Sequence, residues 1–300
     1  MDSAAAQLTE VRVFGVRERA GAFVELTKPR IAFMLVLSAA AGFYLGNRGR
    51  FDFLLFVNAM LGITLLAFGV ATLNQFIERR TDALMDRTAN RPLPSGKVTG
   101  TEALVFGVLL TLVAEVYLYF LVNPLTALLG VTVIIGYVLM YTPLKRLTPA
   151  STAIGAIPGA MPPLMGWTAS TDEITLGGWA LFTFLFLWQF PHFLAIAWMY
   201  REQYAKAGIL MLPVVEAEGK ITARQIVLFS IMMVPVSFAP FFLGFAGWVF
   251  LASSTVLGIW FLLESIRAAR AKTPETARRL LLVSVIYLPL IFAIMVLDKR

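Results

Sequence analysis

Long apolar segments alternate with short polar loops along nearly the whole chain, and this alternation restricts the fold more than any other feature of the sequence. A helix that crosses the apolar part of a bilayer needs about 20 predominantly apolar residues. Nine segments approach this length: 31–46, 53–77, 101–121, 125–142, 151–169, 176–199, 222–243, 246–263 and 280–297. Because 59% of the residues are apolar and only 14% are charged, we predict an all-α, polytopic membrane protein with about nine transmembrane helices around a central cavity.

The positions of the basic residues test this segment map independently of hydropathy. If the N-terminus lies inside, 21 of the 25 Lys and Arg residues fall in inside loops. The four that fall outside are Arg48, Arg50, Lys299 and Arg300. Cytoplasmic loops carry an excess of Lys and Arg, so the asymmetry predicts a cytoplasmic N-terminus and an external C-terminus. Residues 1–30, which lack a cleavable signal pattern, are expected to form a cytoplasmic segment ahead of a single transmembrane domain, 31–300.

The composition also excludes several kinds of function. Cysteine is absent, which excludes disulfides and thiolate chemistry, and His192 is the only histidine, so no zinc site built from protein ligands is expected. The basic residues lie in short loops rather than in a soluble patch, so the net charge of +7 favours membrane orientation and no nucleic-acid binding. We expect the chain to lie in a bacterial plasma (inner) membrane, in contact with the lipid bilayer, with its chemistry on the cytoplasmic face.

The stretch from Asn74 to Gly96, which reads NQFIERRTDALMDRTANRPLPSG, is the strongest candidate for a functional site. Asn74, Glu78 and Asp82 are four residues apart, and since each such step turns a helix by about 400°, they share one face. Mg²⁺ prefers hard oxygen ligands and is usually bound by one or two carboxylates together with substrate phosphates. Arginines such as Arg87, which follows, match phosphate oxygens in a bidentate manner. The stretch is therefore typical of a site that holds a divalent cation and a phosphate together.

Several motifs, in order along the chain, resemble one family. The pattern N-x3-E-x3-D-x2-M-D-R-T-x2-R-P, which starts at Asn74, resembles the first aspartate-rich motif of the UbiA-type intramembrane prenyltransferases. Residues 26–30 (LTKPR) resemble the entry to their first helix, and residues 141–146 (YTPLKR) resemble their second basic loop. Three further segments resemble the heme O synthase (protoheme IX farnesyltransferase) branch of that family: 191–193 (PHF), 201–204 (REQY) and 211–214 (MLPV).

The resemblance implies an enzyme that transfers a farnesyl group from farnesyl diphosphate to a vinyl group of heme b, with addition of water, giving heme O and diphosphate. It implies Mg²⁺ as cofactor and heme b as substrate. The implied metal ligands are Asn74, Glu78 and Asp82, which together with Lys145 form the implied catalytic set. The implied diphosphate ligands are Arg87, Arg91, Lys145 and Arg146. Heme O would pass to a partner that makes heme A or assembles a terminal oxidase.

Three positions depart from the family pattern, and one of them is Leu210, which stands where a proline is expected before Met211. Glu78 stands where the family often has Asp, which keeps the carboxylate but places it on an arm that is one methylene longer. Gln203 stands where an Asp is common. A second metal ion would therefore need Glu202 as its carboxylate ligand, and Glu202 completes the expected metal-binding set.

Two roles stay open at the level of sequence. His192 is either a hydrogen-bonded packing residue or a heme contact, and because imidazole is a common ligand of heme iron, we adopt the heme contact as a working hypothesis. Lys28 and Arg30 are evenly balanced between diphosphate ligands and simple markers of topology.

Two features within the apolar segments each allow two interpretations from the sequence. Glu115 lies well inside the third segment and either reaches toward the outer face or lines a cavity. In the fifth segment, Gly155 and Gly159 together with three prolines indicate either a close helix crossing or a broken helix, and we interpret them as packing.

Two other functions fit parts of the sequence. A related enzyme could use the same diphosphate site to prenylate an aromatic or quinone precursor, and residues 191–193 and 211–214 argue against it. An ion-coupled membrane transporter would also carry acidic residues in its helices. Transporters, however, place ion sites near the bilayer midplane and are often built from internal repeats, whereas here the polar residues gather at one membrane face and no clear repeat is present.

Overall fold

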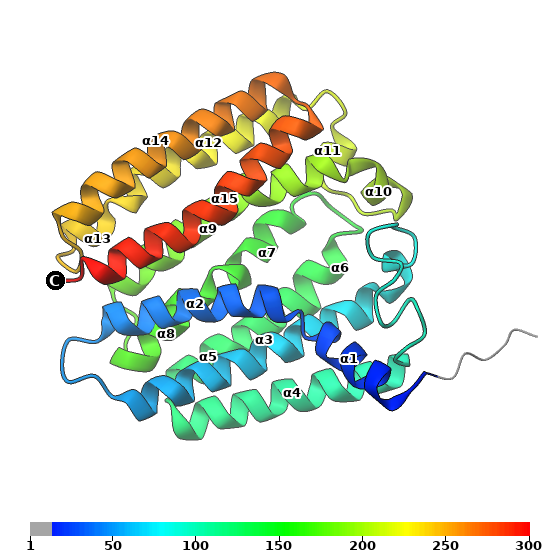
Figure 1. Cartoon of the computed structure of the whole chain (residues 1–300), viewed down its shortest axis with the longest axis horizontal. Helices are drawn as coiled ribbons and strands as arrows, with labels where there is room; N and C mark the ends of the chain where they lie inside the picture. Colours follow the sequence, from blue (N-terminus) through cyan, green and yellow to red (C-terminus); the bar gives the residue numbers. More distant parts are fainter. Residues whose placement is uncertain (1–13) are drawn as a thin grey trace, which may run out of the picture.

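The structure is a computed structural model that describes residues 14–300, and this part of the chain is a bundle of helices lying side by side (Figure 1). In chain order the helices are α1 Val16–Leu26, α2 Pro29–Gly46, α3 Phe53–Asp82, α4 Gly100–Leu121, α5 Pro124–Val133, η1 Ile134–Tyr141, α6 Thr142–Leu144, α7 Ser151–Gly159, α8 Met161–Thr171, α9 Leu176–Met199, α10 Arg201–Lys206, α11 Leu212–Val215, α12 Lys220–Ser237, α13 Ala239–Phe242, α14 Trp248–Ala271 and α15 Pro274–Leu297. η1 is a π-helix that continues α5 without a break. The all-α prediction is confirmed.

Within residues 14–300, eight helical stretches are long and apolar enough to cross a membrane. They are 29–46, 53–82, 100–121, 124–144, 176–199, 220–242, 248–271 and 274–297. Each coincides with one of the nine segments expected from the sequence. The remaining expected segment, 151–169, consists of two shorter helices, so the count of nine unbroken spans is not confirmed.

The break in this segment lies where the prolines gather. α7 ends at Gly159, one residue after Pro158, and α8 starts at Met161 with Pro162 and Pro163 in its first turn. Proline has no N–H and clashes with the carbonyl of the preceding turn, so it is tolerated at the start of a helix but interrupts its interior. The interpretation of these residues as packing alone was therefore wrong, since they also end one helix and start the next.

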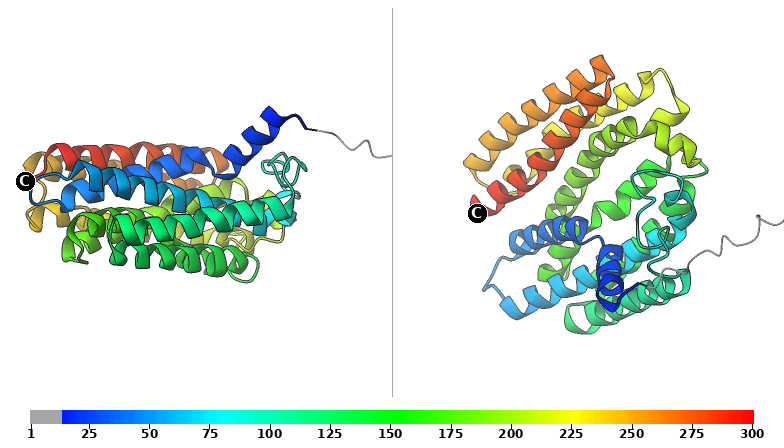
Figure 2. Two further views of the ribbon diagram at one scale, coloured as in Figure 1. Left: turned by 90° about the horizontal axis from the view of Figure 1, so that it is seen from below. Right: turned by 45° about the vertical axis from the view of Figure 1, so that its right-hand side comes forward.

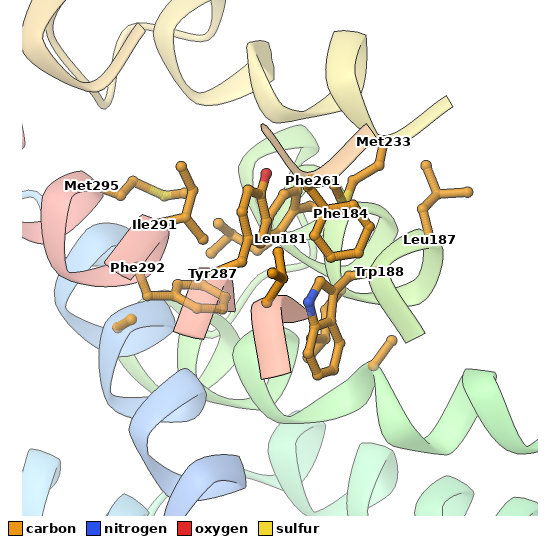
Figure 3. Packing of buried hydrophobic residues seen from close by; sticks show 14 of the residues in the cluster. Leu181, Phe184, Leu187, Trp188, Met233, Phe261, Tyr287, Ile291, Phe292 and Met295 are labelled. Carbon is orange, nitrogen blue, oxygen red and sulfur yellow. The ribbon is translucent and has the colours of Figure 1, made fainter. Parts of the chain in front are cut away.

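The bundle has two large apolar clusters. α3, α4 and α5 pack around one cluster, and α9, α12, α14 and α15 pack around the other. Figure 3 shows part of the second cluster, in which Phe184 of α9 lies against Tyr287 and Phe292 of α15. α2 and α8 contribute side chains to both clusters and thereby join the two halves.

α2 and α8 approach closely enough for their backbones to touch. A Cβ at Gly42 would lie 2.0 Å from the carbonyl oxygen of Pro163, and a Cβ at Gly166 would lie 1.8 Å from that of Ala39. Small residues allow membrane helices to pack at short distance, where van der Waals contact replaces the missing hydrophobic drive. The contact holds the broken segment in the middle of the bundle.

The connections gather at the two ends of the bundle. One end carries 83–99, 145–150 and 200–219, and α1 leans away from the bundle at this same end (Figures 1 and 2). The other end carries 47–52, 172–175 and the C-terminus (Figure 1). The first end is the one that the basic residues predict to be cytoplasmic, and this orientation stays a prediction.

The predicted division of the chain at residue 30 also stays a prediction. Residues 1–13 of the expected cytoplasmic segment lie outside the described part. Of the remainder, α1 packs through Ala22 and Leu26 against Val98 in the loop 83–99 and Ala103 in the first turn of α4. The N-terminal segment is therefore attached to the bundle within the described residues.

Replacing Gly166 with alanine should lower the thermal midpoint of the protein in detergent. The added methyl meets a backbone oxygen that cannot move unless α2 and α8 separate, and overpacking of this kind costs about 1–3 kcal/mol. Gly21→Ala in α1 is the matched control, because its new methyl meets no atom within 4 Å apart from its chain neighbours and the backbone of its own helix. A Gly166→Ala protein as stable as this control would contradict the described contact.

Candidate active site

The polar face predicted on the second apolar segment is present at the end of α3. α3 continues to Asp82, beyond the apolar run, and therefore carries Asn74, Glu78 and Asp82 on consecutive turns. Asn74 and Asp82 are buried, with 1% and 2% of their surface exposed, and the Glu78 side chain is 12% exposed. Three oxygen-bearing side chains are thus withdrawn from water on one face of one helix.

Each of these side chains accepts a hydrogen bond from a different cation. Lys28 Nζ donates to Asn74 Oδ1 at 2.7 Å. Lys145 Nζ donates to Glu78 Oε1 at 2.7 Å, and Arg91 Nη1 donates to Asp82 Oδ2 at 2.7 Å. A buried carboxylate is costly unless it is paired and hydrogen-bonded, so the cations stabilise the polar face. Arg91 and Lys145 were expected as diphosphate ligands rather than as partners of these carboxylates, and the role of Lys28 was left open.

Lys28 reaches the cluster because the chain turns sharply between α1 and α2. Its backbone is left-handed, with φ of 49°, and Pro29 then begins α2, where the missing N–H of proline is not needed. Burial, followed by the positive charge of Arg91, lowers the pKa of Lys28 to about 8. The surroundings therefore make a positive charge at Lys28 costly, and a negatively charged ligand nearby would relieve this cost.

Lys145 directly follows α6, the short helix that continues the π-helix η1. Its ammonium lies 4.2 Å from the centre of the Tyr141 ring and is bound to Glu78. Burial alone would lower the pKa of Lys145, but the Glu78 carboxylate overcomes this and raises it well above its ordinary value. Thr142 Oγ1 donates to the Tyr137 carbonyl at 2.8 Å and accepts from Asn74 Nδ2 at 3.1 Å. π-helices are rare and are frequent at functional sites, and this one links the basic loop to α3.

The loop 83–99 and α10 form a cover beside the cluster. The guanidinium of Arg87 lies 4.6 Å from the centre of the Tyr200 ring and donates to Tyr204 Oη at 3.3 Å. The backbone N–H of Arg87 donates to Gln203 Oε1 at 3.3 Å. Leu210 N–H in turn donates to the carbonyl of Lys145 at 2.7 Å. Three loops that are distant in sequence are therefore hydrogen-bonded to one another at this end of the bundle.

The structure does not bring every expected residue into this cluster. Arg146 and Glu202 are exposed, and neither makes a side-chain hydrogen bond or ion pair within residues 14–300. Gln203, next to Glu202, is the residue of α10 that faces the loop 83–99. Within the described residues, no three Asp, Glu or His side chains lie close enough together to hold a metal ion by themselves.

The donor set nevertheless fits Mg²⁺. The two carboxylates of Glu78 and Asp82 and the amide oxygen of Asn74 are hard ligands on consecutive turns of α3. Mg²⁺ needs only one or two protein carboxylates when substrate phosphates and water complete its coordination. The residues present are therefore sufficient for a metal ion that is shared with a phosphorylated substrate.

His192 lies apart from the cluster, deeper in the bundle. It is seven residues before the end of α9, about 10 Å along the helix axis. Its Nδ1 is 2.7 Å from Ser284 Oγ of α15, and its ring stacks on Trp188 with 4.6 Å between ring centres. The structure thus places the expected heme-contacting residue between α9 and α15, on the apolar side of the polar cluster.

Glu115 does not reach toward the outer face. Both of its carboxylate oxygens are buried and have no hydrogen-bond partner within residues 14–300. They lie against Gly130 of α5, where an added Cβ would lie 2.5 Å from Oε1 of Glu115. The alternative that Glu115 extends to water is therefore excluded by its placement.

Sequence reasoning missed three members of the cluster. Thr142 and Tyr204 lie within motifs that were recognised, but no role was assigned to them. Lys28 was recognised without a decision, because a basic residue at a loop is the expected marker of topology. Pro29 restricts the backbone of Lys28, but it favours extended backbone rather than the left-handed conformation that Lys28 adopts, so it does not predict the direction of this side chain.

Comparison with known proteins agrees with this arrangement. The model of the UbiA prenyltransferase family matches residues 35–291. A protein from Solibacter usitatus named protoheme IX farnesyltransferase is 46% identical over 286 residues, covering 92% of this chain and 98% of its own length. A protein of the same name from Salinibacter ruber is 44% identical over 276 residues, covering 92% of this chain and 98% of its own length.

Two solved structures share the fold at low sequence identity. A digeranylgeranylglyceryl phosphate synthase superposes with a TM-score of 0.79 at 18% identity, covering 94% of this chain and 98% of that one. A UbiA homologue from Archaeoglobus fulgidus, bound to GPP and Mg²⁺, superposes with a TM-score of 0.67 at 18% identity, covering 91% of this chain and 99% of that one. The family match, the relatives and the shared fold together show that this chain is an integral membrane enzyme belonging to the UbiA prenyltransferase family.

Proposed function

We propose that this protein transfers a farnesyl group from farnesyl diphosphate to a vinyl group of heme b, with addition of water, and releases heme O and diphosphate. The observation that carries the proposal is the high identity to relatives named protoheme IX farnesyltransferase, which reaches 46% and extends over 92% of the chain. The described site supports the same chemistry, because it combines hard oxygen ligands with several cations at the mouth of an apolar bundle.

The proposed metal ion is Mg²⁺, which neutralises negative charge on the diphosphate when it is bound. Asn74, Glu78 and Asp82 would hold it, and Glu202 is the proposed ligand of a second ion. Because Glu202 is exposed on α10, it would have to turn toward α3 to take part. A neighbour of the same fold, the Archaeoglobus fulgidus homologue bound to GPP and Mg²⁺, supports the involvement of a metal ion.

The proposed diphosphate site uses the cations that surround the oxygen cluster. Arg91 and Lys145 already lie beside Asp82 and Glu78, and Arg87 lies on the adjoining loop. Arg146, at the exposed edge, would approach the phosphate from outside. Preorganised positive charge of this kind stabilises the negative charge that develops on the leaving group in the transition state. Lys145 is therefore proposed as a catalytic residue as well as a diphosphate ligand.

The farnesyl chain and the acceptor would occupy the apolar side of the cluster. Departure of diphosphate leaves an allylic cation, and the π electrons of a heme vinyl group form the new carbon–carbon bond. The resulting cation on the former vinyl carbon then takes up water, which loses a proton. Apolar surroundings limit earlier capture of the cation by water. His192, deeper in the bundle between α9 and α15, is proposed to contact the heme.

The proposed site lies on the cytoplasmic face of a bacterial inner membrane. The basic residues at this end of the bundle support that orientation, and the bacterial origin of the relatives supports the compartment. Farnesyl diphosphate would enter from the cytoplasm and heme from the bilayer. A partner that makes heme A, or that assembles a terminal oxidase, would receive the product.

The two other functions are less well supported. Membership in a family of prenyltransferases supports an enzyme over an ion-coupled transporter. A prenyltransferase that acts on an aromatic or quinone precursor would use the same diphosphate site, and only the acceptor would differ. The names of the most similar relatives favour heme b as the acceptor.

Purified protein in detergent, supplied with heme b, farnesyl diphosphate and Mg²⁺, should yield a porphyrin that is heavier by one farnesyl and one hydroxyl group. Mass spectrometry of the extracted porphyrins measures this product directly. Consumption of farnesyl diphosphate with unmodified heme would reject heme b as the acceptor but keep the prenyltransferase site. A folded protein that consumes neither substrate would contradict the proposed reaction.

Asp82→Asn should lower kcat on the order of 100- to 1,000-fold, the range found when one preorganised electrostatic group is removed. The substitution keeps an oxygen for Arg91 to bind but removes the charge that we propose for the metal. Asp172→Asn is the matched control, because Asp172 is exposed, lies at the opposite end of the bundle from Asp82 and has a left-handed backbone that Asn tolerates. Near-normal turnover by Asp82→Asn would remove Asp82 from the metal site.

A further inference from the structure

His192 has one ring nitrogen, Nε2, that makes no hydrogen bond to residues 14–300, and this nitrogen indicates a further role for the residue. Nδ1 is bound to Ser284, whereas Nε2 makes no hydrogen bond within residues 14–300. The buried hydroxyl of Tyr287 also lacks a partner, but it is sealed among side chains. Nε2 is not sealed in this way, and the His192 side chain as a whole is only partly buried. One ring nitrogen is therefore fixed and the other is available to a ligand.

The hydrogen bonds of Ser284 determine which nitrogen of His192 carries the proton. Ser284 Oγ lies 2.6 Å from the backbone carbonyl oxygen of Leu281, and a carbonyl can only accept. The single hydrogen of the hydroxyl is thus donated to Leu281. Ser284 must then accept a hydrogen bond from Nδ1–H of His192 at 2.7 Å. In the neutral ring this leaves a lone pair on Nε2.

The surroundings keep this ring neutral and hold its plane. No ion pair in residues 14–300 involves His192, and a buried cation without a partner is costly. The ring stacks on Trp188 with an interplanar angle of 21°. Trp188 Nε1 donates at 3.2 Å to the backbone carbonyl of Ser284, the residue that also binds the imidazole (Trp188 is labelled in Figure 3). Ser284 therefore fixes both rings of the stack from α15.

We propose that Nε2 of His192 binds the iron of the heme substrate, and that Ser284 is the positioning residue that orients this ligand. This inference rests on the proposed function, since it concerns the heme acceptor. A histidine that ligates a metal almost always donates its other ring N–H to a neighbouring acceptor, which fixes the tautomer and the direction of the lone pair. Heme iron is commonly bound by histidine in this way.

Binding of the iron by His192 would determine how the porphyrin is oriented toward the farnesyl group. The lone pair of Nε2 forms the bond to iron, and no proton is released because Nε2 carries none. With the iron fixed to α9, the porphyrin can turn only about this bond, so a vinyl group can be held near the allylic carbon. Such orientation matters because reacting atoms must approach to about 3–3.5 Å before reaction. His192 lies about 10 Å below the end of α9, so the porphyrin would extend from there toward the polar cluster.

Comparison of two porphyrins separates ligation from packing. Heme b and metal-free protoporphyrin IX have the same shape, but only heme b can bind Nε2. His192→Ala should weaken heme b binding by more than about 10-fold, the lower end of the loss seen when only the partner of a ligating histidine is removed. The same substitution should leave the affinity for protoporphyrin IX unchanged within a factor of two to three. Affinities are measured by absorbance titration of purified protein in detergent.

The ferrous heme complex gives a spectroscopic signature of the bond. The wild-type protein should show the iron–histidine stretching band in resonance Raman spectra. His192→Gly should lack this band, and added imidazole should restore it. Ser284→Ala should keep the band at a shifted frequency and weaken heme binding about 10-fold. Ser284→Thr should retain the wild-type frequency.

Ser254→Ala is the matched control for Ser284→Ala. Ser254 is also a fully buried serine that donates to the carbonyl three residues earlier, that of Leu251, but it contacts no histidine. The band and the heme affinity of Ser254→Ala should equal those of the wild type. A shift as large as that of Ser284→Ala would assign the effect to helix packing and overturn the positioning role.

The outcomes distinguish this inference from the function on which it rests. Formation of heme O by a wild-type protein whose heme complex has no iron–histidine band would overturn the ligation and leave the function standing. The ligation is also overturned if His192→Ala weakens binding of both porphyrins equally. A protein that binds no heme and forms no heme O would overturn the proposed function, and the inference would fall with it.

Discussion

The structure depends on the burial of three oxygen-bearing side chains at the end of a membrane helix. Asn74, Glu78 and Asp82 have little contact with water, and two of them are carboxylates. Charges in such surroundings are costly unless they are paired and hydrogen-bonded, so partners must come from elsewhere in the chain. They come from three separate connections, which explains why the turn before α2, the loop 83–99 and the segment after the π-helix all meet at one place. The fold at this end of the bundle thus brings together the cations that pair with the buried oxygens of α3.

This arrangement separates the charged part of the proposed reaction from its apolar part. Cations and oxygens lie at one end of the bundle, beneath loops that are hydrogen-bonded to one another through Arg87, Tyr204 and Lys145. Below them the interior is mainly apolar, and His192 is bonded there to Ser284. A diphosphate needs the first environment and an allylic cation needs the second. The depth of His192 gives the acceptor a place between α9 and α15.

The parts of the fold and of the site that could be predicted from the sequence are those that leave a regular pattern in it. The face of α3 follows from four-residue spacing, and eight of the expected segments are present because apolar length is a direct requirement of the bilayer. The fifth segment was expected to be one span, but prolines at its centre divide it, and hydropathy does not register that break.

Lys28 could not be assigned, because the direction of its side chain depends on a left-handed backbone that only the packing of α1 and α2 determines. Adjacent residues were also hard to separate: of Glu202 and Gln203, only Gln203 faces the loop 83–99, and this depends on how the short helix α10 docks.

The central claim is that Mg²⁺ and diphosphate bind together at the oxygens of α3 and the cations beside them. The most direct measurement is the affinity of a non-reactive farnesyl diphosphate analogue for the purified protein across a series of Mg²⁺ concentrations, by calorimetry. The account predicts that Mg²⁺ strengthens binding of the analogue by more than about 10-fold, and that the analogue strengthens binding of Mg²⁺ by the same factor, because coupling between two ligands is reciprocal. An affinity for the analogue that does not change with Mg²⁺ would contradict the account.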